Sequence, residues 1–415
     1  MNREAQAAPV NQKELSLPPF AALPAAVFQL ANGLQVIHQE VTATPAVVVD
    51  VWVRAGTAAE PEAGSGMAHF LEHMIFKGTA KLAAGVFDSV IENQGGVTNA
   101  ATSHDYAHYF MITPAQTLEM TLPLLAELLL HAEIPEAEFG RERDVVLDEI
   151  RRAEDTPDWQ AYQALVESIY QEHPYGRPIL GVPERLMERS PAELRDFHRR
   201  FYHPENMTVV VVGGVERSTA LELVSHHFAG HQTQSTDAPA NQAAQPSMTG
   251  VQRRSLELPR LEQARLLMAW RGPGSELLEH AYGLELLSVL LAGGRSSRLI
   301  TQLREQQGLV QEITSSFSLQ RESGLFTICA WLEPQHLDAV EALIAEQLQV
   351  LGNTPISPEE LERCQRSLCN DYAFSTETPY QLAALYGYYS TIAQVEAAVT
   401  YPEMIRNLTA ADLQY

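Results

Sequence analysis

The hydrophobic and polar positions of the chain follow two kinds of pattern. Two segments rich in β-branched residues, AVVVDVWVRAG from Ala46 and MTVVVVGGV from Met207, are bounded by glycine and predict strands. Two others, AQTLEMTLPLLAELLLHA from Ala115 and EAEFGRERDVVLDEIRRAED from Glu136, carry apolar residues at helical spacing. SPAELRDFHRRFY, from Ser190, starts with the serine, proline and glutamate typical of a helix start. The chain is therefore expected to mix helices and strands.

A polar segment divides the chain. Residues 231–250, HQTQSTDAPANQAAQPSMTG, are nearly free of large apolar side chains and predict a linker. It separates residues 25–230 from residues 251–415, and residues 1–24 form an N-terminal extension. A chain of 415 residues is too long for one ordinary core and suggests about two to three domains, of which the linker delimits two.

The two halves share a faint repeat. FGRERDVVLDEIRRAEDTPDW, from Phe139, aligns with LERCQRSLCNDYAFSTETPYQ, from Leu361, at an offset of 222 positions that places Glu149 over Asp371. A constant offset over some twenty residues predicts two copies of one unit. The second copy stops at Tyr415, so we expect it to lack a helix end and a strand that the first copy contains.

Composition narrows the function classes. The net charge of −24 disfavours general nucleic-acid binding and anionic membranes. The three cysteines, Cys329, Cys364 and Cys369, form no disulfide framework. No apolar run is long enough to span a bilayer, and the N-terminus has no apolar signal region. A cytoplasmic location is expected, with the periplasm as the alternative if a signal precedes this chain.

The segment GMAHFLEHMIFKGT carries the candidate chemistry. Ser65 is expected to cap a helix that Gly78 ends, and on that helix His69 and His73 share one face. Two imidazoles at this spacing can bind one zinc ion, with Glu72 beside them as a general base. Such a pair is by itself more often a solvated or hydrogen-bonded face. The apolar flanks favour a buried turn, whose polar groups need partners that a metal supplies.

A catalytic zinc needs three protein ligands and a water. The helix predicted in RERDVVLDEIRRAED carries Glu142 and Glu149, seven residues apart and therefore on one face. Either acid can reach a metal, and the spacing does not choose between them.

GMAHFLEHMIFKGT resembles the inverted zinc motif of the pitrilysin family, which includes mitochondrial processing peptidase and insulin-degrading enzyme. The resemblance extends from about residue 25 to the end of the chain. It implies an α/β (α+β) fold of two homologous domains, each with a mainly antiparallel sheet packed by helices. It also implies Zn²⁺ held by His69, His73 and Glu149, with Glu142 supporting the site, and no metal site in the second domain.

The resemblance also implies where substrate lies. VTNAATSH resembles the family's substrate-binding edge strand, which assigns peptide contacts to Asn99 and Ala100. An Arg and a Tyr of the second domain hold substrate in fully active members; Arg304 matches the Arg, but Gln311 stands where the Tyr is expected. Some two-chain relatives place zinc on one subunit and the Arg and Tyr on the other. We therefore expect a homodimer, or a heterodimer with an Arg/Tyr-bearing homologous subunit.

The resulting hypothesis is a zinc-dependent endopeptidase that hydrolyses extended peptides or processes peptide segments. The first alternative is a non-catalytic core or peptide-binding subunit of the same fold, which Gln311 favours and the intact His-x-x-Glu-His sequence disfavours. The second alternative is a metal hydrolase acting on non-peptide amides, which the predicted edge strand disfavours.

Overall fold

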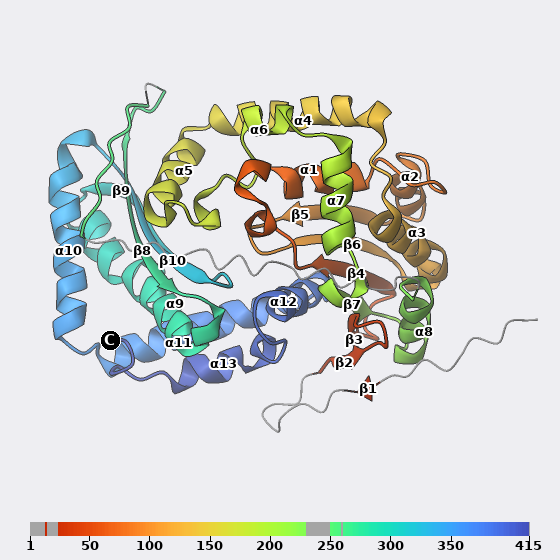
Figure 1. The fold of residues 1–415 in the computed structure, drawn as a ribbon. Coiled ribbons are helices and arrows are strands. Elements are labelled where there is room, and N and C mark those ends of the chain that lie inside the picture. The colour runs from red at the N-terminus through yellow and green to blue at the C-terminus, as the bar shows by residue number, and fades with distance from the viewer. Residues whose placement is uncertain (1–12, 15–23, 230–249, 259, 415) are drawn as a thin grey trace, which may run out of the picture. The chain divides into compact units, whose positions relative to one another are not determined.

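The computed structural model describes residues 13–14, 24–229, 250–258 and 260–414, and their contacts form two compact units (Figure 1). The first unit takes residues up to Asp148, Ile179–Asn241 and Glu377–Thr391, and the second takes Glu149–Pro178, Gln242–Thr376 and Ile392–Tyr415. The predicted linker, except Gly250, and most of the predicted N-terminal extension lie outside the described residues. Within the described chain, no helix is both long and apolar enough to cross a membrane.

The first unit is built on a seven-stranded sheet, with strands in the order β1-β2-β3-β7-β4-β6-β5. The parallel pair is β3 with β7, and the other neighbours are antiparallel, which confirms the mainly antiparallel sheet. The strands are β1 (Lys13–Glu14), β2 (Ala26–Gln29), β3 (Gln35–Glu40), β4 (Ala46–Val53), β5 (Val97–Thr102), β6 (Ala107–Pro114) and β7 (Met207–Gly213). Among the described residues β5 pairs with β6 alone, so it lies at the edge of the sheet.

The central strands have continuous apolar runs because both faces of the sheet are covered. Every residue of β7 is buried, as are all residues of β4 except Ala46. Helix α1 packs against β5 and β6 on one face. On the opposite face α12 approaches so closely that a Cβ added at Gly387 would overlap the indole ring of Trp52. Figure 1 shows α12 in blue, the colour of residues late in the sequence.

Helices surround this sheet. They are α1 (Met67–Ile75), α2 (Val86–Asn93), α3 (Leu118–His131), α4 (Glu136–Glu154), α6 (Pro183–Met187), α7 (Pro191–Phe201), α8 (Arg217–His227) and α12 (Pro379–Ile392). The expected helix start at Ser190 is confirmed: its side chain accepts from the Glu193 amide, while the Glu193 carboxylate accepts from the Ser190 amide.

The second unit contains a three-stranded antiparallel sheet in the order β8-β10-β9, formed by β8 (Ala264–Pro273), β9 (Val310–Ser318) and β10 (Ser323–Leu332). Its helices are α5 (Pro157–Tyr170), α9 (Leu278–Ala292), a π-helical segment (Ile300–Gln306), α10 (Leu337–Asn353), α11 (Pro358–Phe374) and α13 (Ala397–Asn407). Leu286, Ile328 and Val340, from α9, β10 and α10, are fully buried in one core. The predicted α/β architecture with two sheet-containing units is confirmed.

Candidate metal centre

Helix α1 presents the two histidines, and its N-terminus is held by a residue that sequence reasoning missed. The prediction that Ser65 caps this helix is wrong: the N-cap is Gly66, whose φ of 93° is the left-handed region that glycine tolerates. The buried carboxylate of Glu60 instead accepts hydrogen bonds from the amides of Gly66 (2.9 Å) and Ala68 (2.6 Å). A carboxylate at this end also suits the helix dipole, so Glu60 fixes where α1 begins.

The end of α1 also differs from the prediction. The helix stops at Ile75 with Phe76 as its C-cap, not at Gly78. Gly78, at φ 105°, instead forms an isolated β-bridge with Ala83. The histidines keep the predicted spacing, because both lie inside the shorter helix.

His69 and His73 lie side by side on α1, with ring centroids 4.8 Å apart. His69 is 6% exposed. Burial, and then the charge of His73, lower the pKa of His69 to about 3. The His69 imidazole is therefore neutral at physiological pH, which is the form that binds a metal.

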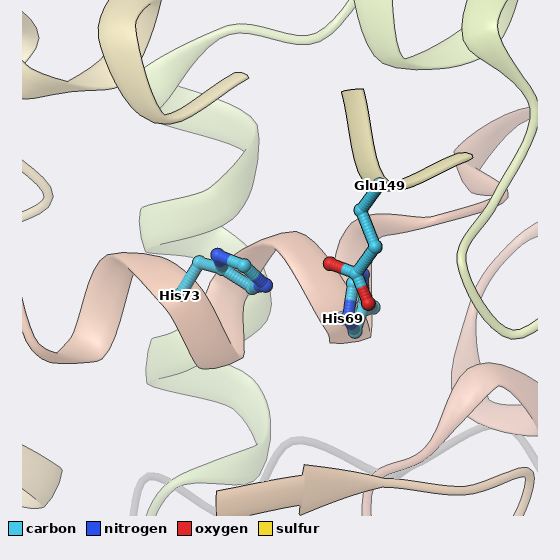
Figure 2. A group of neighbouring side chains, drawn as sticks. All are labelled: His69, His73 and Glu149. Carbon is cyan, nitrogen blue, oxygen red and sulfur yellow. The ribbon is translucent and has the colours of Figure 1, made fainter. Parts of the chain in front are cut away.

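Glu149 completes a three-residue group with these histidines. One possible ligand atom from each of His69, His73 and Glu149 lies within 4.8 Å of the others, and Figure 2 shows the Glu149 carboxylate directed toward α1. The boundary between the two units falls after Asp148, but α4 continues through it as one helix from Glu136 to Glu154. The same helix therefore carries Glu142 and Glu149, two turns apart on one face.

Glu142 contacts the site through His73. Its Oε1 lies 2.8 Å from His73 Nδ1, and its Oε2 pairs with Lys77 Nζ at 2.7 Å. A carboxylate at Nδ1 holds the proton there, so Nε2 is the His73 atom that would act as a metal ligand. The sequence spacing did not choose between Glu142 and Glu149 as the third ligand, but the two acids have different neighbours in the structure.

Glu72 faces the edge of the sheet. Its Oε2 accepts a hydrogen bond from the hydroxyl of Thr102, the last residue of β5. This contact orients the carboxylate predicted to act as general base. The sequence placed Thr102 in an expected edge strand but held no signal that its hydroxyl meets Glu72, because 30 residues separate the two.

The substrate residues expected from the resemblance lie in both units. Asn99 and Ala100 are on β5, where the exposed Asn99 side chain accepts a hydrogen bond from the Ala100 amide at 2.9 Å. Arg304 is in the π-helical segment of the second unit and pairs with the neighbouring Glu305 at 2.8 Å. Gln311 is exposed on β9. The roles of these residues toward substrate remain predictions.

The donor set fits a catalytic zinc ion. Two imidazoles and one carboxylate are a ligand set of zinc peptidases, which leaves a fourth position for water. The neutral His69 and the carboxylate at His73 Nδ1 match what such a site requires of its ligands and their neighbours.

Comparison with known proteins identifies the family. Residues 35–182 match the model of the insulinase family (peptidase family M16), and residues 190–368 match that of the peptidase M16 inactive domain. A protein of Mycobacterium leprae, named as an uncharacterized zinc protease, is 30% identical over 82% of this chain and 76% of its own length. The chain belongs to peptidase family M16, the pitrilysin family.

Further similarities concern both sequence and fold. The zinc protease PqqE of Helicobacter pylori is 29% identical over 92% of this chain and 87% of its own length. The crystal structure of a protease from Helicobacter pylori superposes with a TM-score of 0.88 at 28% identity, covering 94% of this chain and 95% of that one. Pitrilysin shares the fold, with a TM-score of 0.76 at 21% identity over 98% of this chain and 44% of its own.

Proposed function

We propose that this M16 protein is a zinc-dependent endopeptidase that hydrolyses extended peptides. The observation that carries the proposal is the grouping of His69, His73 and Glu149 beside Glu72, whose carboxylate touches the edge strand β5. Relatives named as zinc proteases support it. The edge strand favours peptides over other amides, because it offers backbone groups that an added strand can pair with.

The residues have separate tasks in this proposal. His69, His73 and Glu149 would hold zinc, which when bound acidifies a water and polarises the scissile carbonyl. Glu72 takes the proton of the attacking water at its carboxylate and delivers it to the leaving amine nitrogen. The hydroxyl of Thr102 keeps that carboxylate in place through both transfers. Glu142 keeps the His73 proton on Nδ1.

Peptide binding would use the outer side of β5. The Ala100 amide donates to the side chain of its neighbour Asn99, an arrangement that an incoming carbonyl can replace. The freed Asn99 amide group can then bond to the peptide backbone. This exchange gives Asn99 and Ala100 their proposed substrate contacts.

We further propose that the chain acts in a dimer. Gln311 lacks the phenol that the family resemblance leads one to expect, so a homologous subunit bearing the Arg and Tyr would complete the substrate side. The second candidate function, a non-catalytic peptide-binding subunit, rests on the same residue.

The test is hydrolysis of an unstructured, internally quenched peptide by the zinc-loaded chain and by Glu72→Gln. We expect the variant to keep its zinc, measured by atomic absorption, and to lose about 10²-fold to 10⁴-fold in kcat, the usual contribution of a general base. Glu92→Gln, on the exposed side of α2, is the matched control and should retain full activity. Bound zinc without hydrolysis in the wild type, alone and with an Arg/Tyr-bearing subunit added, would favour the non-catalytic function.

A further inference from the structure

An apolar strip lies beside the edge strand on the face opposite α1. It consists of Val97 on β5, Phe110 and Ile112 on β6, and Tyr380 on α12. Val97 is 57% exposed and Tyr380 is 36% exposed, while Phe110 and Ile112 are partly exposed. Large apolar side chains gathered at an exposed edge are typical of a binding surface.

The strand register places these side chains on one face. Val97 pairs with Ile112 and Asn99 with Phe110 across the β5–β6 ladder, and directly paired residues project to the same side. Thr102, five positions from Val97, projects to the α1 side, where it meets Glu72. The apolar strip and the candidate metal centre therefore lie on opposite faces of the same edge.

Phe110 and Tyr380 form the centre of the strip. Their ring centroids are 4.7 Å apart with planes inclined at 49°, a tilted aromatic contact. Helix α12 thus contributes a side chain to the edge at a point far from β5 in sequence. The exposed neighbours on this face of β5 are Asn99 and Ala101, which are polar or short, and both rings stay partly exposed beside them.

A peptide paired with β5 must alternate its side chains between the two faces. If its scissile bond joins the residues opposite Thr102 and Ala101, near Glu72, the residue opposite Asn99 is the third from the bond and lies three positions, about 10 Å, from the residue opposite Thr102. An odd separation turns that side chain to the face opposite α1, over Phe110 and Tyr380.

We propose that the apolar strip is a specificity subsite for a large aliphatic or aromatic side chain of the substrate, three residues from the cleaved bond. The inference rests on the proposed peptidase function and adds the substrate class that this site prefers. Whether the preferred residue precedes or follows the bond depends on the direction in which the peptide pairs with β5.

The surroundings of the strip disfavour acidic side chains of the substrate, because the carboxylate of Asp50 lies beneath it. Asp50 is fully buried on the same face of β4, where its Oδ1 lies 3.0 Å from His108 Nδ1. Burial, and then the charge of Asp50, raise the pKa of the Tyr380 phenol. A substrate carboxylate in contact with Tyr380 would meet the same two penalties, loss of water and a like charge.

The experiment is a peptide series with Ala, Leu, Phe or Asp at each position from the third before to the third after the cut. For the wild type we expect kcat/KM for Phe or Leu to exceed that for Ala or Asp by about tenfold at one outer position. Tyr380→Ala should reduce this ratio to about two, and Tyr380→Phe should preserve it. Tyr162→Ala, which removes an exposed tyrosine of α5, is the matched control and should leave the ratio unchanged.

The outcomes separate the inference from the function on which it rests. A wild type that cleaves without a preference at an outer position, or a preference that survives Tyr380→Ala, overturns the subsite and leaves the peptidase standing. If no peptide is cleaved, even with an Arg/Tyr-bearing subunit added, the proposed function fails. Binding of the Phe and Ala peptides to Glu72→Gln, followed by fluorescence anisotropy, then decides the subsite: a Phe preference abolished by Tyr380→Ala supports it, and equal binding overturns it.

Discussion

Helices α4 and α11 are counterparts at an offset of 222 residues, yet their acids have different partners. On α4, Glu142 pairs with His73 and Lys77, and Glu149 lies beside both histidines. On α11, Asp371 has Glu285 of α9 as an electrostatic neighbour. Burial of Glu285, with the charge of Asp371 adding to it, raises the pKa of Glu285 to about 7.

The difference concerns the surroundings of the acids near the proposed metal centre and of their counterparts in the second copy. In the first copy Glu60, Glu72 and Glu142 each contact a group able to share their charge: backbone amides, a hydroxyl, and a histidine with a lysine, respectively. In the second copy Glu285 and Asp371 are electrostatic neighbours of like charge, and the Tyr401 hydroxyl hydrogen-bonds to Glu285. At the offset of 222, Leu291 and Arg295 stand where the histidines would be. Under the proposed function, the same scaffold would hold a metal ion in the first copy and pack its acids against neighbouring helices in the second.

The largest expected effect comes from replacing Glu149 of α4, whose counterpart on α11 is Asp371. Glu149→Gln should lower zinc affinity by more than about 100-fold, because deleting a ligand costs more than deleting its supporting partner. Asp371→Asn, the counterpart, should leave both zinc content and hydrolysis unchanged. Zinc retained after dialysis against a competing chelator measures the effect. Equal retention by Glu149→Gln and the wild type would show that Glu149 is not a ligand.

The second prediction concerns Glu285, the buried acid of the second copy, and the pH dependence of the unfolding free energy that it causes. Because the folded-state pKa of Glu285, about 7, lies above its ordinary value of 4.5, the protonated acid stabilises the fold fully below pH 4.5. That contribution disappears as the pH rises through 7. Relative to wild type, Glu285→Gln should therefore gain up to about 3 kcal/mol in unfolding free energy between pH 4.5 and pH 8. Urea denaturation at both pH values measures it.

Glu403→Gln, an exposed acid on α13, serves as the control for this titration and should show no comparable dependence on pH. If the difference in unfolding free energy between Glu285→Gln and the wild type is the same at every pH, the pKa of Glu285 is not raised in the folded protein.

The smallest effect compares the hydroxyls that support Glu72 and Glu285. Thr102→Val removes one hydrogen bond to a carboxylate and should lower kcat by about tenfold, with zinc content unchanged. Thr102→Ser should restore most of the rate, because it keeps the hydroxyl. Tyr401→Phe should instead lower stability and leave kcat unchanged. Equal losses of kcat in both variants would contradict the division of roles between the two copies.

Much of the fold followed from local patterns. Strands β4 and β7 and helices α3, α4 and α7 formed where apolar spacing and the Ser190 capping box predicted them. The predicted ends of α1 were wrong: the carboxylate of Glu60 fixes its start at Gly66, and the helix stops at Ile75, before Gly78. Such boundaries depend on contacts with other segments, which compete with the local signals for capping.

Sequence by itself determined that His69 and His73 share a face and that Glu142 and Glu149 share another, because helical geometry is set by neighbours a few residues apart. Only the tertiary structure decided that Glu142 bonds to His73, that Thr102 bonds to Glu72, and that Tyr380 of α12 packs on Phe110. These contacts join residues 69, 30 and 270 positions apart, and such contacts depend on how whole elements pack rather than on any local pattern.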